Sequence, residues 1–219
     1  MEATVKTLVL VRHGRSIAND DPGVYLTMPD HAIPLCDPRG DPTVLAAGDR
    51  IASLGLPAAE VCSWRSTFLR CAQTETLVLQ RAFADAAAHV ARRESFLLRE
   101  QDFGDWDGLT EEQMQAKDPD RYARRARMTD KLGRFYFRYP SGESRADVVQ
   151  RMATFLGKLH RSRYAHHLLF LHGVTQRAFR MAWMNRPVEW FEAEPNASNA
   201  SVLVIRRDAE QWWRDAYLE

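Results

Sequence analysis

The sequence has almost no net charge and no long hydrophobic run, and each absence excludes a class of protein. Its 30 Lys and Arg residues nearly balance its 29 Asp and Glu residues, so the formal net charge is +1. A balanced chain has no global field for nucleic acid or an anionic membrane, so any preference for an anion must come from a local site. No stretch approaches the roughly 20 apolar residues that span a bilayer. We therefore expect neither a nucleic-acid partner nor a membrane partner.

Cysteine is also scarce, with only Cys36, Cys62 and Cys71 in the chain. They have no metal-ligand spacing, and an odd number does not make a disulfide framework. The first apolar run is only about six residues long and has no cationic leader, so no secretory signal is expected. These features predict a protein of the reducing cytoplasm.

Two nucleotide-binding patterns are missing as well. The first apolar run is not followed by Gly-x-Gly-x-x-Gly, and no Walker-type Gly-Lys-Ser/Thr occurs in the chain. Both patterns use glycine-rich turns to hold phosphates against backbone N–H groups. A nucleotide-binding Rossmann protein is therefore disfavoured.

What the sequence does contain is a pair of apolar runs that each stop at a histidine followed by a glycine. The run over residues 8–11 ends at the Arg-His-Gly triplet 12–14, and the run over residues 168–171 ends at His172 and Gly173. Each pattern predicts a buried strand, a tight turn and then a helix. Ligands of open α/β sheets bind at the carboxyl ends of strands. Two histidines delivered to one edge of a sheet predict a ligand site rather than packing.

Strands and helices are predicted to alternate along the rest of the chain. Further strands are expected near residues 61–64, 89–93 and 201–205, the last being the final strand, and helices near 44–54, 69–79, 148–159 and 174–179. His166 and His167 are expected to end a helix before the strand at 168–171. The alternation predicts one α/β domain over residues 1–219, a three-layer α/β/α fold with a mostly parallel central sheet.

Two segments do not fit this alternation. Residues 19–43 are rich in Asp, Pro and Gly and predict a long loop, a kind of segment that is often functional. Residues 100–142 are aromatic, glycine-punctuated and charged, and are interpreted as a lid-like insertion. Within them, the Lys and Arg residues of 121–138 alternate with aromatic residues. This basic segment is either a solvated helix whose aromatic side packs down or a basic lid over an anionic substrate.

Four cationic or chargeable side chains are candidates for one pocket, namely Arg12, His13, Arg70 and His172. Arg70 lies at the start of the helix predicted after the second strand. Guanidinium groups bind phosphate oxygens in pairs and stay charged at any physiological pH. Helix N-termini add N–H donors for an anion, and a glycine after each histidine allows a close approach of the backbone. The expected ligand is a phosphate.

The motifs and their order along the chain resemble those of the histidine phosphatase superfamily, the family of phosphoglycerate mutases and related acid-type phosphatases. The resemblance runs from about residue 5 to residue 205 and rests on Arg-His-Gly at 12–14, the block Ser66–Thr74, Glu100 before a Phe-Gly-x-Trp-x-Gly run, and His172-Gly173. The segments 28–31, 99–104 and 133–144 resemble a phosphoglycerate-mutase-like branch found in plants, fungi and bacteria.

The resemblance implies a mechanism. His13 would be the nucleophile that forms a phosphohistidine, and Arg12, Arg70 and His172 would bind the phosphoryl oxygens. Glu100 would protonate the leaving oxygen and then activate water.

The resemblance also implies the remaining phosphate contacts. Asn19 and Gly173 would be additional ones. No metal and no other cofactor are expected, because arginines and helix dipoles supply the positive charge.

Some residues near these motifs depart from the family or have no assigned role. Arg15 stands where family members often carry Glu or Gln, and Glu75 follows Gln-Thr where the family has Ala. Tyr25 and His31 are weak candidates for shaping the substrate pocket. Glu143 either faces the pocket or begins a helix.

The leading prediction is a metal-independent phosphatase that hydrolyses a small phosphorylated molecule. Two alternatives stay open. The phosphohistidine would return its phosphoryl group to substrate in an isomerase of the phosphoglycerate mutase type, and an inactive module on the same fold would only bind a phospho-ligand. The sequence specifies neither the substrate nor the oligomeric state.

Overall fold

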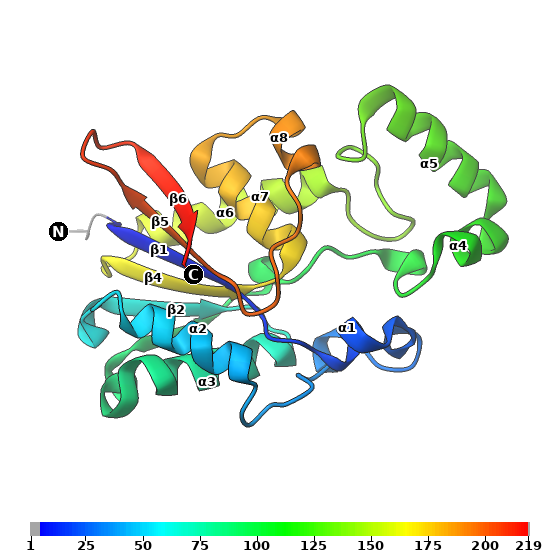
Figure 1. The fold of residues 1–219 in the computed structure, drawn as a ribbon. Coiled ribbons are helices and arrows are strands. Elements are labelled where there is room, and N and C mark those ends of the chain that lie inside the picture. Colours follow the sequence, from blue (N-terminus) through cyan, green and yellow to red (C-terminus); the bar gives the residue numbers. More distant parts are fainter. Residues whose placement is uncertain (1–4, 219) are drawn as a thin grey trace.

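A computed structural model describes residues 5–218 and shows a central β-sheet with helices on both faces (Figure 1). The six strands lie in the order β3-β2-β4-β1-β5-β6. They are β1 (Thr7–Arg12), β2 (Val61–Arg65), β3 (Ala91–Glu94), β4 (His166–Leu171), β5 (Val202–Arg207) and β6 (Trp213–Tyr217). β3, β2, β4 and β1 pair in parallel, whereas β5 is antiparallel to β1 and β6 to β5. The predicted α/β fold with a mostly parallel sheet is confirmed.

The helices divide between the two faces of the sheet (Figure 1). α2 (Pro42–Ala52) and α3 (Leu69–Phe83) cover one face, and α6 (Arg145–His160) and α7 (Gly173–Met184) cover the other, with α8 (Val188–Ala193) beside α7. Along β1, Leu8 and Leu10 pack into the core under α6 and α7, while Val9 and Val11 pack under α2 and α3. Burial on both faces explains why the strand reads as a continuous apolar run.

The carboxyl ends of the two central strands lie side by side. β1 and β4 pair with Arg12 opposite Leu171, so the residues that follow each strand leave the sheet at the same edge. β2 pairs with β4 on its other side, and α3 begins four residues after β2 ends. The fold therefore brings the ends of β1 and β4 and the start of α3 to one edge.

The start of α6 is fixed by its first residues. Ser144 is the N-cap, its hydroxyl accepts from the N–H of Asp147 at 3.2 Å, and the Asp147 carboxylate accepts from the N–H of Ser144 at 2.7 Å. This reciprocal pair is a capping box, which satisfies N–H groups that the first turn leaves free.

Two of the expectations about strands are wrong. β5 is followed by β6, which was not predicted, because β6 has no fully buried residue and its mixed sequence gives no periodic signal. His166 and His167 begin β4 instead of ending a helix. His167 is completely buried, and its Nδ1 accepts a hydrogen bond from Trp64 Nε1 at 3.2 Å. The sequence alone does not distinguish a polar residue that is hydrogen-bonded to a neighbouring strand from one that ends a helix.

The segment 19–43 contains short helical turns rather than one uniform loop. α1 (Ile17–Asp20) is a single turn after Gly14, and 3-10 turns follow at Pro22–Leu26 and Asp30–Ala32. The helix predicted after the first strand is therefore present but only four residues long.

The segment 100–142 carries two helices that extend away from the sheet, α4 (Glu111–Lys117) and α5 (Pro119–Leu132) (Figure 1). α5 has no buried residue, as expected for a solvated helix. Aromatic side chains pack beneath it, with Trp106 stacked on Phe137 at a centroid distance of 6.0 Å. No helix within residues 5–218 is long and apolar enough to cross a bilayer.

His167 links stability to pH. Burial is the main cause that lowers its pKa to about 4 from an ordinary value of 6.5. The unfolded chain therefore takes up a proton before the folded one does, and stability is lost as the pH falls from 6.5 to about 4. We expect His167→Gln to reduce this acid loss by about 3 kcal/mol, measured by urea unfolding across that range. His89→Gln, at an exposed site, is the control. Parallel curves for His167→Gln and the wild type would contradict the assignment.

Candidate active site

The two histidines predicted from the sequence meet at the carboxyl edge of the sheet. His13 follows β1 and His172 follows β4, and their ring centroids are 5.2 Å apart. His13 is 4% exposed and His172 is fully buried. Burying two imidazoles costs free energy unless their ring nitrogens are hydrogen-bonded. Two such residues side by side therefore indicate a functional site.

The hydrogen bonding of His13 leaves one ring nitrogen free. Its Nδ1 lies 2.7 Å from the carbonyl oxygen of Gly14. A carbonyl oxygen only accepts, so Nδ1 carries the proton and Nε2 keeps its lone pair. Burial, followed by the charge of Arg70, lowers the pKa of His13 well below its ordinary value. A neutral imidazole with an unprotonated Nε2 is the form that a nucleophile requires.

Arg70 and Arg12 are the cations beside this pair. Arg70, the second residue of α3, is 2% exposed and donates from Nη1 to the carbonyl and the carboxylate of Asp30 at 2.8 and 2.7 Å. Arg12 donates from Nη1 to the carbonyl of Ala197. Across residues 5–218, the buried Nε of each arginine has no hydrogen-bond partner. Buried guanidinium N–H groups without partners are suited to bind an anion.

His172 closes the site from the other side. It is the N-cap of α7, and its Nε2 lies 2.9 Å from Ser66 Oγ. Its Nδ1 is buried and has no partner in the part of the chain that the structure describes. Burial and then Arg70 lower its pKa well below the ordinary value. Gly173 begins α7. A Cβ at this position would come within 2.9 Å of the Asn196 side chain, so only glycine lets the backbone lie this close to Asn196.

Glu100 lies at the start of the same helix. Its Oε1 accepts from the N–H and the hydroxyl of Thr175, both at 3.1 Å, and its Oε2 accepts from the N–H of Val174 at 3.2 Å. The first turn of α7 thus fixes this carboxylate, as helix N-termini do for anions. Burial lowers the pKa of Arg12, and the nearby charge of Glu100 partly offsets that effect. Glu100 therefore borders the cationic pocket.

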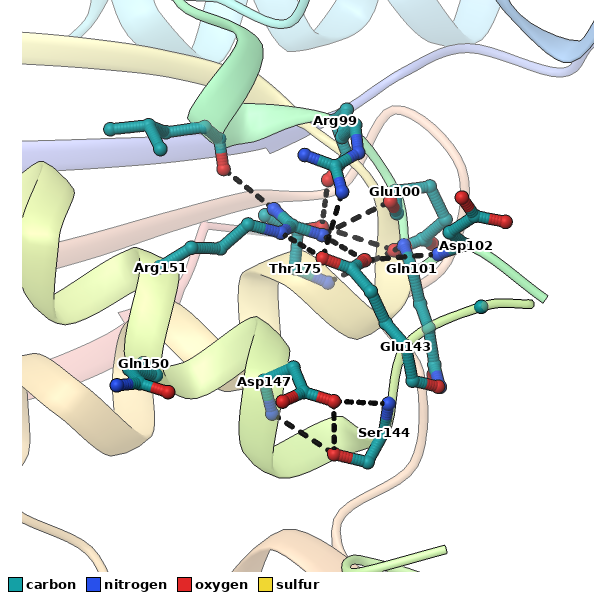
Figure 2. Close-up of polar contacts among 12 residues, drawn as sticks. Arg99, Glu100, Gln101, Asp102, Glu143, Ser144, Asp147, Gln150, Arg151 and Thr175 are labelled. Carbon is teal, nitrogen blue, oxygen red and sulfur yellow. Dashed lines mark hydrogen bonds and ion pairs between the residues drawn. The ribbon is translucent and has the colours of Figure 1, made fainter. Parts of the chain in front are cut away.

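A buried ion-pair network fixes the segment that carries Glu100 (Figure 2). Arg151 of α6 donates to both carboxylate oxygens of Glu143, at 2.9 and 3.0 Å, and to the carbonyls of Leu97 and Glu100, at 2.6 and 3.0 Å. Glu143 also accepts from Arg99 at 2.9 Å. Burial raises the pKa of Glu143, but Arg151, the N–H of Asp102 and Arg99 together more than offset this and keep the pKa below its usual range. Glu143 therefore supports the segment under Glu100 and, as one of its two predicted roles required, stands at a helix start, directly before the N-cap Ser144 of α6.

Asn19 lies near the site, but its side-chain oxygen is already engaged. Its Oδ1 accepts from the N–H and the hydroxyl of Ser16, both at 3.0 Å. Asn199 donates to the carbonyls of His13 and Gly14, at 3.1 and 3.3 Å, and to Asn19 at 3.3 Å. A phosphate contact for Asn19 stays a prediction, and Asn199 is a site neighbour that no sequence motif indicated.

The other residues noted in the sequence fall in different places. Tyr25 lines a cavity that also contains Glu100, whereas His31 is exposed. Arg15 is largely exposed and pairs with Asp20 at 2.5 Å. Glu75 is buried and pairs with Arg92 at 2.6 Å, so it stabilises the fold.

Comparison with known proteins gives a consistent family. The model of the histidine phosphatase superfamily (branch 1) matches residues 8–218. Phosphoglycerate mutase-like protein AT74 of Arabidopsis thaliana is 34% identical over 214 residues, which cover 91% of this chain and 64% of that protein. Broad-range acid phosphatase DET1 of Saccharomyces cerevisiae is 34% identical over 119 residues, covering 51% of this chain and 33% of that protein. The chain thus spans less than two thirds of the length of AT74.

Solved structures show the same fold. Mycobacterial glucosyl-3-phosphoglycerate phosphatase in complex with VO3 superimposes with a TM-score of 0.72 at 24% identity, over 97% of this chain and 98% of that chain. A putative α-ribazole-5′-P phosphatase from Escherichia coli gives a TM-score of 0.74 at 20% identity, over 99% and 97% of the two chains. The phosphoglycerate-mutase-like architecture expected from the motifs is confirmed.

The network around Glu143 gives a stability prediction. Glu143→Gln leaves two arginines without their shared carboxylate, so we expect a loss of about 3 kcal/mol in the free energy of unfolding. Arg151→Met leaves Glu143 paired with Arg99 and is expected to cost less. Urea unfolding at pH 7 measures both. A loss of only about 0.5 kcal/mol for Glu143→Gln, as at an ordinary surface site, would show that the pair is not an important constraint.

Proposed function

The chain belongs to branch 1 of the histidine phosphatase superfamily, and from this premise we propose that it hydrolyses a phosphomonoester through a phosphohistidine on His13. The observation that carries the proposal is the buried pair His13–His172 beside two arginines whose Nε atoms lack partners within residues 5–218. A site of that kind offers a nucleophile and a place for a phosphoryl group at once. The acid phosphatase among the relatives supports hydrolysis as the reaction class.

In the first half-reaction, His13 Nε2 attacks phosphorus and the bond to the leaving oxygen breaks. Arg12, Arg70 and His172 bind the non-bridging oxygens, whose charge must be compensated in the transition state. Glu100 gives its proton to the leaving oxygen, so the alcohol departs neutral.

In the second half-reaction, a water molecule attacks the phosphohistidine. Glu100, now ionised, accepts a proton from that water, phosphate is released and His13 is regenerated. The positive charge comes from the guanidinium groups of Arg12 and Arg70, so the proposal requires no metal.

The isomerase alternative differs only in the acceptor of the phosphoryl group. A mutase must retain a substrate with a second anionic group close to Glu100. The cavity next to Glu100 contains the carboxylate of Asp107, which disfavours such a group. We therefore propose hydrolysis. The binding-module alternative leaves Glu100, fixed beside the cationic pocket, without a purpose.

The nucleophile is tested by His13→Ala. We expect its steady-state hydrolysis of an aryl phosphate to fall more than a hundredfold, because the proposed covalent intermediate forms on the imidazole that the substitution removes. Wild-type activity should persist in EDTA. His89→Ala, an exposed histidine away from the site, is the control and should keep full activity. Retention of more than about a hundredth of the wild-type rate in His13→Ala would exclude the assignment.

The acid is tested by Glu100→Gln with two leaving groups. A poor leaving group needs a proton in the transition state, whereas an activated aryl oxide leaves without one. We expect kcat/KM of Glu100→Gln to fall about a hundredfold or more for an alkyl phosphate and about tenfold or less for 4-nitrophenyl phosphate. Equal losses for both esters would argue against proton donation by Glu100.

A further inference from the structure

A cavity of about 230 Å³ opens beside Glu100. Four aromatic residues line it, Tyr25, Phe103, Trp106 and Tyr139. Because Glu100 borders both this cavity and the cationic pocket, a substrate with its phosphoryl group at His13 would place its alcohol part here. The cavity is therefore the place where the substrate's leaving group is selected.

The walls of the cavity are fixed by packing between segments that lie far apart in the sequence. Tyr139 contacts Phe103 edge to face at a centroid distance of 5.0 Å and Trp106 at 6.1 Å. Gly108 has a φ of +70°, and a Cβ there would come within 2.6 Å of Tyr25 Cβ. Only glycine lets the segment that carries Trp106 approach the turn that carries Tyr25. A cavity with walls of this kind is preformed.

The charges in the cavity are negative. Asp30 lines it but is already paired with Arg70 at 2.7 Å, so its charge is compensated. Asp107 also lines it, and its charged neighbours Asp30 and Asp102 outweigh the influence of Arg70. Burial, followed by Asp30, raises the pKa of Asp107 to about 6. At neutral pH the cavity therefore holds an ionised carboxylate that has no compensating cation of its own.

Resting on the proposed function, we propose that this cavity binds an alcohol bearing an ammonium group and rejects one bearing a carboxylate. Aromatic faces attract cations through their quadrupole, and a carboxylate adds direct Coulomb attraction. The same carboxylate repels a second anionic group on the substrate. The substrate class is thus a phosphate monoester of an amino alcohol or a similarly cationic alcohol, and Asp107 is the specificity-determining residue.

The test uses three para-substituted phenyl phosphates that differ in one charge. The substituents are 2-aminoethyl, ethyl and 2-carboxyethyl. All three esters therefore have the same kind of phenolic leaving group and similar size. For the wild type at pH 7.5 we expect kcat/KM to be highest for the ammonium ester, intermediate for the neutral ester and lowest for the carboxylate ester. The two extremes should differ by about tenfold or more.

The variant Asp107→Asn removes the charge and keeps the size of the side chain. We expect it to lower the ratio of kcat/KM between the ammonium and carboxylate esters about tenfold, with the neutral ester changing least. Asp105→Asn is the matched control, because Asp105 lies two residues away, is exposed and does not line the cavity. It makes the same change in net charge and should leave the ratio as in the wild type.

A second measurement needs no variant. Asp30, Asp107, Glu100 and Tyr25 are the titratable groups that line the cavity, and Asp102 and Arg70 act on Asp107 from beside it. Ionisation of the ester phosphate is common to all three substrates and cancels in the ratio. As the pH rises through about 6, Asp107 loses its proton and the preference for the ammonium ester should grow. In Asp107→Asn this rise should be absent.

The outcomes separate the two proposals. No hydrolysis of any ester would overturn the proposed function itself. Hydrolysis of all three esters at similar rates would overturn the assignment of the cavity but not the proposed phosphatase activity. A charge preference that Asp105→Asn removes as fully as Asp107→Asn does would have the same consequence.

Discussion

Buried positive charge at the carboxyl edge of the sheet determines the chemistry that the site can perform. Arg12 and Arg70 are held there by the ends of β1 and the start of α3, and each keeps an Nε without a partner within residues 5–218. Their charges, together with burial, keep the pKa of both His13 and His172 low. The same feature therefore creates an anion site and keeps a lone pair available on the residue proposed to attack. On the proposed function, one arrangement of cations supplies both binding and nucleophile activation.

The charges of Arg12 and Arg70 are balanced by carboxylates that border the cationic pocket. Asp30 holds one face of Arg70, and Glu100 is fixed by the first turn of α7 near Arg12. The Arg151–Glu143 pair lies one layer further out and holds the backbone of Glu100 through its carbonyl. On the proposed function this carboxylate donates and accepts a proton, which requires a fixed position, and the Arg151–Glu143 pair helps to fix that position.

The parts of the site that lie at strand ends could be predicted from the sequence, whereas the parts held by long-range pairs could not. The runs before His13 and His172 identify buried strands, and parallel pairing then puts both histidines at one edge. Asp30 and Arg151 have no such signal, because their partners lie 40 and 51 residues away. The edge strand β6 and the start of β4 at His166 were missed because neither has an alternating apolar pattern. Local periodicity predicts which face of a strand or helix a residue occupies, but not which distant residue it contacts there.

Opposite charges on the two sides of Glu100 make the site directional. On the proposed function, a phosphoryl group binds among arginines while its alcohol lies in a cavity lined by the carboxylates of Glu100 and Asp107. Two adjacent regions of opposite potential orient a substrate with a negative and a positive end before any contact is optimised. A substrate with two anionic ends aligns badly with this field and must expose one of them to Asp107. A mutase has to keep such a doubly anionic molecule bound through two phosphoryl transfers, so the charge pattern around Glu100 itself favours release of phosphate to water.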